Sequence, residues 1–412
     1  MRLDPAREQW MTAPETGTVM RALTADGGAA RFVGGAVRNA LMHRPVTDID
    51  IATPLLPDEV TRRLQAAGLG AVPTGIEHGT VTAIANGKPY EITTLRRDVT
   101  TDGRRATVAF TNDWKEDASR RDFTMNALYA SGDGEVFDFF GGIADLQAGR
   151  VRFVGDPVTR ILEDYLRILR LFRFHAWYGS GDIDADALHA ATHEKAGLAK
   201  LSGERIQKEL LRLLKADNST AMIRAMVDSG ILAEILPVEP NSSRLENLIS
   251  TDRAHGYATD PLLRLAAMLP DDAAAAEAVA ARLKLSNNDA ERLRDLCGAT
   301  EYIGAALSPR ETRALLYRLG TQRFKDRAHL RWAASSDSNA APWQALLEAA
   351  DHWRRPTFPL RGHDVIALGL DPGPQIGRLL SEVEKWWIES DFKPDRAALL
   401  AHLKAIAADS GH

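Results

Sequence analysis

Two aspartates, Asp48 and Asp50, stand one residue apart in the apolar run "TDIDIAT". In a β-strand, residues two apart project to the same face, with a Cα spacing of roughly 6.5 to 7 Å. Two like charges in apolar surroundings are costly unless a cation lies between them. Mg²⁺ fits such a pair, because it binds carboxylate oxygen and keeps positions open for substrate phosphates. The polar face of an edge strand would give the same tripeptide without any chemistry.

The preceding stretch, "FVGGAVRN", favours the functional interpretation. Gly34 and Gly35 follow a β-type run and let the backbone approach a phosphate closely. The predicted helix start supplies N–H donors, and Arg38 adds a planar cationic fork. A dinucleotide-binding glycine fingerprint is the alternative, but Ala36 and Asn39 occupy its second and third glycine positions.

A β-hairpin is predicted in "GTVTAIANGKPYEITTL", where Asn86-Gly87 separates two strand-like arms. This dipeptide favours a two-residue turn with positive φ angles. Glu91, in the second arm, is a third candidate carboxylate, although a strand glutamate facing solvent explains it equally well.

Paired arginines recur in the segment that follows, at Arg96-Arg97, Arg104-Arg105 and Arg120-Arg121. Interspersed acidic residues allow a plain solvated loop, and the turn-rich "TTDGRR" indicates mobility. Beside a phosphate-handling site, we expect a closing flap over a triphosphate or an RNA end.

The segment "EDYLRILRLFRF" predicts one helix with a row of charges. Glu163 and Asp164 precede Arg167 by four and three residues, which places all three on one side, and Arg170 and Arg173 continue the row. Helix-surface ion pairs are the simpler interpretation. An aspartate and an arginine held side by side nevertheless offer the acceptor and the planar donors that reading a base edge requires.

Length and composition limit the possible classes of protein. At 412 residues, with 45% hydrophobic and 26% charged residues, the chain is expected to form several packed units of a soluble protein. No apolar segment approaches the length of a membrane span, so we expect a cytoplasmic protein without membrane contact. The net charge of −5 neither predicts nor excludes nucleic-acid binding. The single cysteine, Cys297, is expected to be a buried thiol without a role.

The β-type runs end near residue 150, and the remaining sequence has helical periodicity. This pattern predicts an α+β protein: a small head with a mixed β-sheet and helices, followed by an all-α body.

Taken together, these motifs resemble the class II tRNA nucleotidyltransferases and bacterial poly(A) polymerases, a branch of the polymerase-β-like nucleotidyltransferases. Within residues 30 to 215, the matching segments occur in the family's order and cover most of the range: "FVGGAVRN…DIDIAT", "RRDFTMNALY", "FDFFGGIADLQAGRVRFVG", "EDYLRILRLFRF" and "GERIQKELLRLL". Two later segments, "RLKLSNND" and "PLRGHDVIALGLDPGPQIGRLL", extend the resemblance. It implies a catalytic nucleotidyltransferase head (1–150), a base-recognising neck (151–217), a body (218–341) and a tRNA-binding tail (342–412).

The resemblance also implies residue roles. Asp48 and Asp50 would be catalytic and would hold two Mg²⁺ ions, while Gly35 and Arg38 would contact the triphosphate. Arg121 and Asp122 would bind the nucleotide, with a role in selecting ribose. Asp164 and Arg167 would act as an amino-acid template for ATP or CTP, and Arg170 and Arg173 would support them in binding the nucleotide.

The implied activity is template-independent addition of C, C and A to the 3′ end of tRNA from CTP and ATP. Relatives commonly have Asp where this chain has Asn39, which puts a charge at that position in doubt. The metal-dependent phosphohydrolase His-Asp pair of longer relatives is missing, since this chain reads "LLRLAAMLPDD" there. We therefore predict no phosphatase or phosphodiesterase activity.

Four alternatives stay open. A poly(A) polymerase would share the scaffold, but its typical Gly-Arg-Arg-Phe-Arg signature is absent from "YEITTLRRDVTTDGRR". A partial enzyme would add only CC or only A, and the intact 96–110 segment speaks against the CC-adding version. A non-catalytic RNA-binding protein would not need to retain the carboxylates and template residues. A small-molecule nucleotidyltransferase would not need so long a helical extension.

Overall fold

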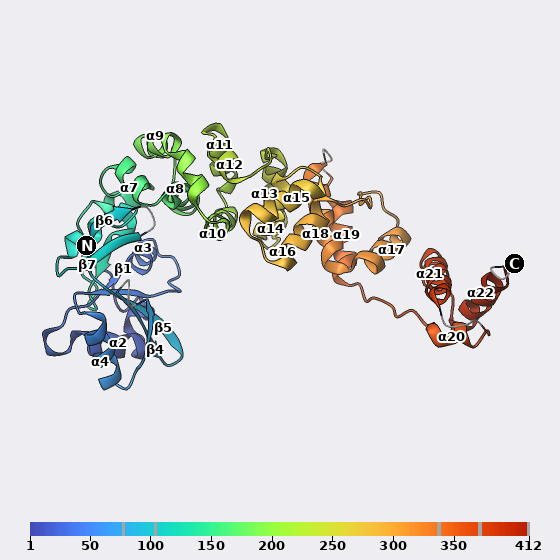
Figure 1. Ribbon diagram of the computed structural model, residues 1–412, viewed down its shortest axis with the longest axis horizontal. Helices are drawn as coiled ribbons and strands as arrows, with labels where there is room; N and C mark the ends of the chain where they lie inside the picture. Colours follow the sequence, from blue (N-terminus) through green and yellow to red (C-terminus); the bar gives the residue numbers. More distant parts are fainter. Residues whose placement is uncertain (76–78, 103–104, 336–338, 370–372, 410–412) are drawn as a thin grey trace. The chain divides into compact units, whose positions relative to one another are not determined.

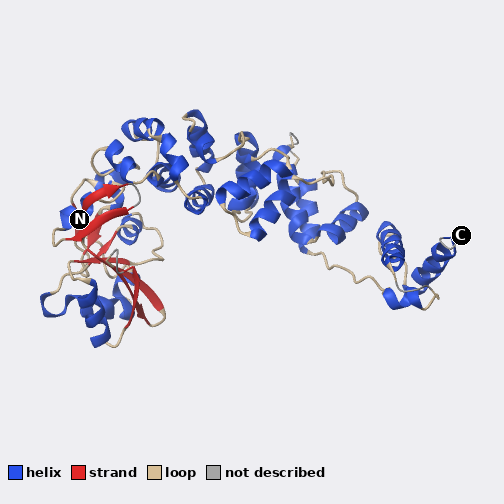
Figure 2. Cartoon of the chain, viewed as in Figure 1, coloured by secondary structure: helices blue, strands red, loops and turns tan. Residues whose placement is uncertain are grey.

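The computed structural model describes residues 1–75, 79–102, 105–335, 339–369 and 373–409. The chain divides into two compact units, Met1–Pro237 with Arg282–Lys284, and Val238–Ala281 with Leu285–His412. Among the described residues every strand lies in the first unit, and the regular structure after Asp138 is helical (Figure 2). The predicted α+β class is therefore confirmed.

A seven-stranded mixed sheet forms the centre of the head, in the order β3-β4-β5-β2-β1-β8-β9. The pairing of β2 with β5 is parallel, whereas the other described pairings are antiparallel. Phe32, Ile51 and Ile92 are fully buried in it. The strands are β1 (Arg31–Val33), β2 (Asp50–Thr53), β3 (Gly70–Gly75), β4 (Thr80–Ala85), β5 (Lys88–Thr94), β8 (Leu128–Ala130) and β9 (Val136–Asp138).

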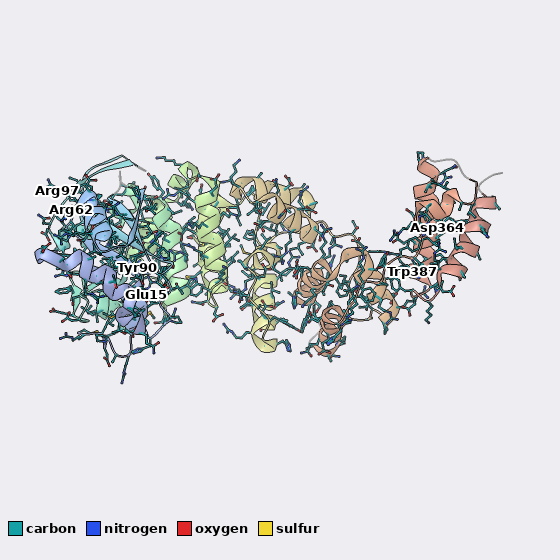
Figure 3. All side chains as sticks on the ribbon, turned by 90° about the horizontal axis from the view of Figure 1, so that it is seen from below. Glu15, Arg62, Tyr90, Arg97, Asp364 and Trp387 are labelled. Carbon is teal, nitrogen blue, oxygen red and sulfur yellow. The ribbon has the colours of Figure 1, made fainter. Side chains whose placement is uncertain are left out.

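Short helices cover this sheet. Two of them, α2 and α4, pack against each other and against β4 (Figure 1). The sequence explains where α4 begins, because Pro57 has the φ of a first helical residue, and Asp58 and Glu59 complement the helix dipole. The hydroxyl groups of Tyr90, labelled in Figure 3, and Thr16 hydrogen bond at 3.0 Å and so tie α2 to β5. The head helices are α1 (Gln9–Thr12), α2 (Pro14–Thr24), α3 (Gly35–Leu41), α4 (Pro57–Ala66), α5 (Trp114–Ser119) and α6 (Gly142–Gln147), with 3-10 turns at Ala25–Gly27 and Thr124–Asn126.

The predicted hairpin is confirmed. β4 and β5 pair from Thr80↔Thr93 to Ala85↔Lys88, and the turn residues Asn86 and Gly87 have φ angles of 50° and 76°. Positive φ at both positions is what this two-residue turn requires.

The arginine-rich segment after β5 differs from the expected loop. Its described residues form two antiparallel strands, β6 (Arg96–Asp102) and β7 (Arg105–Phe110), in a separate two-stranded sheet. The physical reason is the β-branched content of "DVTTD" and "RATVAF", which suits strand pairing better than a loop. Arg104 of the predicted flap lies outside the described residues.

Helices follow the head within the first unit. Helix α8 packs against α10, and this pair supplies much of the site described below. The helices are α7 (Pro157–Glu163), α8 (Leu166–Tyr178), α9 (Ala185–His193), α10 (Gly203–Leu214), α11 (Ser219–Asp228) and α12 (Ile231–Ile235), with a 3-10 helix at Lys195–Lys200.

The second unit is helical in its described parts and has two hydrophobic clusters. One gathers around Phe324 and Trp332, and the other around Val383 and Trp387, a residue labelled in Figure 3. Helix α17 contributes to both clusters. The helices are α13 (Ser242–His255), α14 (Pro261–Met268), α15 (Ala273–Leu283, whose last two residues belong to the first unit), α16 (Asn287–Cys297), α17 (Pro309–Leu319), α18 (Thr321–Ala334), α19 (Ala341–Asp351), α20 (Gly362–Ile366), α21 (Pro374–Glu389) and α22 (Arg396–Asp409). No helix in the described parts of the chain is both long and apolar enough to cross a membrane.

Candidate active site

The turn from β1 to α3 depends on Gly34. Its φ of 66° and ψ of −116° lie in a region that residues with a Cβ atom avoid. Gly35 begins α3, and a Cβ atom added there would lie 3.7 Å from the Arg38 guanidinium. The two glycines therefore leave a side-chain-free backbone beside a buried arginine.

Arg38 is buried, and uncharged groups hold it. Its Nη1 donates to Asn126 Oδ1 at 2.5 Å, and its Nη2 donates to Tyr178 Oη at 2.8 Å and to Asn39 Oδ1 at 2.9 Å. Burial lowers the pKa of Arg38, an effect that Tyr178 and Asp122 oppose. A buried guanidinium without a bonded carboxylate is well suited to receive an anion.

The side-chain amide of Asn39 makes hydrogen bonds to two other residues. Its Oδ1 accepts from Arg38, while its Nδ2 donates to the carbonyl oxygen of Pro45 at 3.1 Å. A carboxylate could accept from Arg38 but could not donate to Pro45. Asparagine at this position therefore keeps the hydrogen bond to Arg38 and also fixes the loop that leads to Asp48.

The carboxylate pair is placed differently from the sequence prediction. Asp50 begins β2, whereas Asp48 lies in the loop before it, so only Asp50 belongs to a strand. The reason is the register of β1 and β2, whose described pairs are Arg31↔Ala52 and Phe32↔Ile51.

Asp50 is half-buried between other carboxylates. Burial, Glu91 and Asp48 together raise the pKa of Asp50 to about 6, and Arg121 opposes this. Glu91 is the Cα partner of Asp50 in the parallel β2–β5 pair, and its side chain is exposed. Mutual repulsion of this kind is relieved by a bound cation.

The donor set fits Mg²⁺. Among the described residues, no three His, Cys, Asp or Glu side chains gather into a metal site on their own. Mg²⁺ bound at substrate sites takes one or two carboxylates and completes its coordination with water and phosphate oxygens. Asp48 and Asp50 supply such a pair.

Arg121 and Asp122 are fixed by different partners. Arg121 donates to Tyr129 Oη and to Asp117 Oδ2, both at 3.1 Å, and these two groups raise its pKa against the effect of burial. Asp122 accepts from Arg170 Nε at 2.7 Å and from Asn126 Nδ2 at 3.0 Å. Burial alone would raise the pKa of Asp122, but Arg170 and Asn126 lower it to about 2.

The predicted single helix over 163–174 is interrupted. Helix α7 ends at Glu163 and α8 begins at Leu166, while Asp164 has extended angles, with φ −157° and ψ 106°. Asp164 Oδ1 accepts from Leu166 N at 3.1 Å, and Oδ2 accepts from Arg205 Nη2 at 2.7 Å. Asp164 therefore does not share a helix face with Arg167, because its carboxylate caps α8 and pairs with α10.

The arginines of α8 are held by acceptors. Arg167 Nη1 contacts Glu163 Oε2 at 2.5 Å, as the i,i+4 spacing predicts, and Nη2 donates to the carbonyl oxygen of Arg120 at 3.1 Å. Arg173 bonds the buried Glu209 on α10. Long, flexible side chains are thereby fixed in orientation.

These groups surround a cavity of about 540 Å³, which we call the arginine cavity. Its lining includes the predicted nucleotide-binding residues. The lining residues are Gly34, Gly35, Arg38, Asp50, Arg121, Asp122, Asn126, Asp164, Leu166, Arg167, Arg170, Arg173, Phe174, Arg205 and Arg212.

A second cavity of about 400 Å³, the tryptophan cavity, adjoins it and shares Asp50 with it. Asp48 lines this cavity only. Its lining residues are Gly35, Arg38, Asn39, Thr47, Asp48, Asp50, Arg173, Trp177, Tyr178, Arg212 and Lys215. Glu91 lies beside Asp50 but is not part of either lining.

Four lining residues were not predicted from the sequence: Arg205, Arg212, Asn126 and Trp177. A signal for the arginines was present, because Arg205, Glu209 and Arg212 recur at i, i+4 and i+7 on α10 and so share one face. Asn126 had no local signal, since its partners Arg38 and Asp122 come from other elements.

Comparisons with known proteins agree with this geometry. Residues 30–152 match the family model of the poly A polymerase head domain, and residues 182–239 match that of the probable RNA and SrmB-binding site of polymerase A. The chain is 35% identical over 387 residues to the mitochondrial CCA tRNA nucleotidyltransferase 1 of Mus musculus, covering 91% of this chain and 86% of that protein. It is 32% identical to the CCA-adding enzyme of Streptococcus gordonii, covering 94% and 96%.

Solved structures show the same fold. The Bacillus stearothermophilus CCA-adding enzyme in complex with CTP is 26% identical, with a TM-score of 0.77 over 96% of this chain and 98% of that one. The Thermotoga maritima CCA-adding enzyme, complexed with tRNA, is 21% identical and shares the fold with a TM-score of 0.70 over 98% and 97%.

The mixed-sheet head, the carboxylate pair and the arginine cavity therefore define a nucleotidyltransferase of the polymerase-β-like class. Within that class, the chain belongs to the family of CCA tRNA nucleotidyltransferases, the CCA-adding enzymes.

Proposed function

We propose that this enzyme adds C, C and A to the 3′ end of tRNA from CTP and ATP, with Mg²⁺ at Asp48 and Asp50. The observation that carries the proposal is the position of Asp50, which lines both cavities. A nucleoside triphosphate in one cavity and an RNA end in the other would meet at the carboxylates. The names of the relatives, and the CTP of the Bacillus structure, support the same substrates.

The arginine cavity binds the incoming nucleotide in this proposal. Asp164 offers carboxylate acceptors and Arg167 a planar guanidinium, which suit the Watson–Crick edges of cytosine and adenine. Arg170 and Arg173 keep the α8 surface in place through Asp122 and Glu209. Gly35 and Arg38 receive the triphosphate, and Arg121 and Asp122 remain the predicted contacts to the ribose.

The transfer step needs no covalent nucleophile on the protein. The 3′-oxygen of the RNA bonds to the α-phosphorus, the bond from that phosphorus to the β-bridging oxygen breaks, and pyrophosphate leaves with the electron pair. The hydroxyl proton passes to solvent. Mg²⁺, when bound, would lower the charge on these oxygens. The chain itself positions both substrates and supplies the charges that surround the reacting groups.

The division into head, neck, body and tail belongs to the same proposal, with tRNA lying along the helical parts and the tail contributing contacts. So does a cytoplasmic location, which the bacterial relatives favour.

The test offers the purified protein tRNA transcripts that end just before CCA, after C and after CC, with labelled CTP or ATP and Mg²⁺. An Asp48→Ala, Asp50→Ala double variant is the control. Growth that stops at CCA and is absent in the variant supports the proposal. Long A-tails on generic RNA would instead show a poly(A) polymerase, and addition of only C or only A a partial enzyme. Binding without incorporation would contradict catalysis.

A further inference from the structure

The tryptophan cavity differs chemically from the arginine cavity although both contain Asp50. It has no counterpart of the Asp164–Arg167 pair among its lining residues. The members that it does not share with the arginine cavity include the aromatic Trp177 and Tyr178 and the cation Lys215, and the cation Arg212 lines both cavities. Aromatic rings next to cations bind single-stranded nucleic acid without reading its sequence.

Trp177 is a preformed stacking surface. It is 38% exposed, yet its Nε1 donates to the carbonyl oxygen of Arg212 on α10 at 2.9 Å. Its own carbonyl oxygen accepts from Arg44 Nη1 at 2.7 Å. The indole is thus fixed in orientation while part of it stays open to the cavity, so little entropy is lost when a base stacks on it.

Two cations, Arg212 near the end of α10 and Lys215 directly after it, are available to bind phosphate. Arg212 and Lys215 are exposed, and no carboxylate of the described residues lies within ion-pair distance of either. Most arginines of the arginine cavity are in contrast paired with carboxylates: Arg121 with Asp117, Arg167 with Glu163, Arg170 with Asp122, Arg173 with Glu209 and Arg205 with Asp164.

We propose that the tryptophan cavity binds the 3′-terminal nucleotide of the RNA acceptor, an inference that rests on the proposed function. The terminal base stacks on Trp177, and Arg212 and Lys215 contact the last phosphates. The terminal 3′-hydroxyl then lies on the Asp48 side of Asp50, and the triphosphate lies on the other side. Because stacking is tolerant of the base, one cavity serves acceptors ending in the discriminator base, in C and in CC.

A fluorescence experiment tests the stacking without any turnover. A tRNA transcript that ends just before CCA carries 2-aminopurine as its last base and is titrated with enzyme in the absence of nucleotide. We expect the fluorescence to be quenched by the wild type and by Trp177→Phe, which keeps a ring, but not by Trp177→Ala. Equal quenching by all three proteins would overturn the assignment of Trp177.

Kinetics test the cations with a matched control. Lys215→Ala should raise the KM for RNA by about tenfold and leave the KM for CTP and ATP unchanged. Lys208→Ala removes an exposed lysine of α10 that lines neither cavity, and it should leave both KM values unchanged. If Lys215→Ala raised the KM for nucleotides instead, the cavity would be a triphosphate site and the proposal would be wrong. Failure of the wild type to extend any tRNA would overturn the proposed function itself.

Discussion

Arginine–carboxylate pairs gather in both units of this chain, but they enclose very different volumes. In the first unit they line the arginine cavity of about 540 Å³. In the second unit Arg327 contacts Asp295 and Glu301, each at 2.6 Å, beside a cavity of about 20 Å³. The larger volume accommodates a nucleotide, whereas the smaller one is close to the space that a single water requires.

The difference shows that the role of an ion pair depends on the volume of the cavity beside it. In the second unit, Arg292 links Asp260 and Asp326 at 2.6 and 2.7 Å, and we expect this pair to contribute to stability. Cys297 lines the small cavity there and is buried, as predicted, and burial raises the pKa of its thiol to about 11.

The largest expected effect on activity in the first unit comes from a substitution of Asp50. Asp50→Asn should lower kcat at least about a thousandfold, because the α-phosphate of the transferred nucleotidyl group would lose the Mg²⁺ that the carboxylates hold. The free energy of unfolding should not fall, since a neutral side chain relieves repulsion from Glu91 and Asp48. Single-turnover kinetics and urea denaturation measure the two quantities, and an active Asn variant would contradict the assigned site.

The second unit should respond in the opposite way. Arg327→Met should lower the free energy of unfolding by about 3 kcal/mol, because two carboxylates lose a buried partner. The kcat of the folded enzyme should be unchanged. Arg323→Met on the same helix is the control, since its pair with Glu291 is exposed and its second carboxylate, Asp295, lies 3.8 Å away, so that it should contribute less than about 1 kcal/mol. A loss of kcat in the Arg327 variant would show that the second unit acts on the chemistry.

A substitution of Arg167 distinguishes the effect of guanidinium geometry from the effect of charge in the arginine cavity. Arg167→Lys keeps the cation but loses the planar fork, so kcat/KM for CTP and ATP should fall about fiftyfold while stability changes little. Arg62, labelled in Figure 3, pairs with Glu59 at the surface, and Arg62→Lys makes the same change there and should be neutral. Initial rates with each nucleotide measure the effect, and unaltered rates would remove Arg167 from the template.

The smallest effect concerns the pH dependence of the Asp122–Arg170 pair. The folded-state pKa of Asp122 is about 2, below the usual value near 3.9 for an aspartate. The pair therefore stabilises the fold fully above about pH 4 and loses this contribution, about 2 kcal/mol, as the pH falls to 2. Asp122→Asn should flatten the decline of stability in that window in acid-unfolding curves. An unchanged slope would show that the carboxylate is not held as described.

Local features of the fold were readable from the sequence. The Asn86-Gly87 hairpin, the β-type runs before and after "GGAVRN" and the helical remainder follow from turn chemistry and periodicity, which act over a few residues. Prediction was wrong where distant partners intervene. Asp164 leaves the predicted helix because Arg205 and the start of α8 hold its carboxylate.

By itself, the sequence determined which chemical groups are available: a carboxylate pair after a glycine turn, and an arginine row with i,i+3 and i,i+4 spacing. These motifs also indicated the family. Only the tertiary structure decided which of these charges are free and which are bound. The packing of α8 against α10 pairs Arg173 with Glu209 and fixes Trp177 through the backbone of Arg212. Such pairings depend on two helices remote in sequence meeting face to face, and no local pattern specifies that contact.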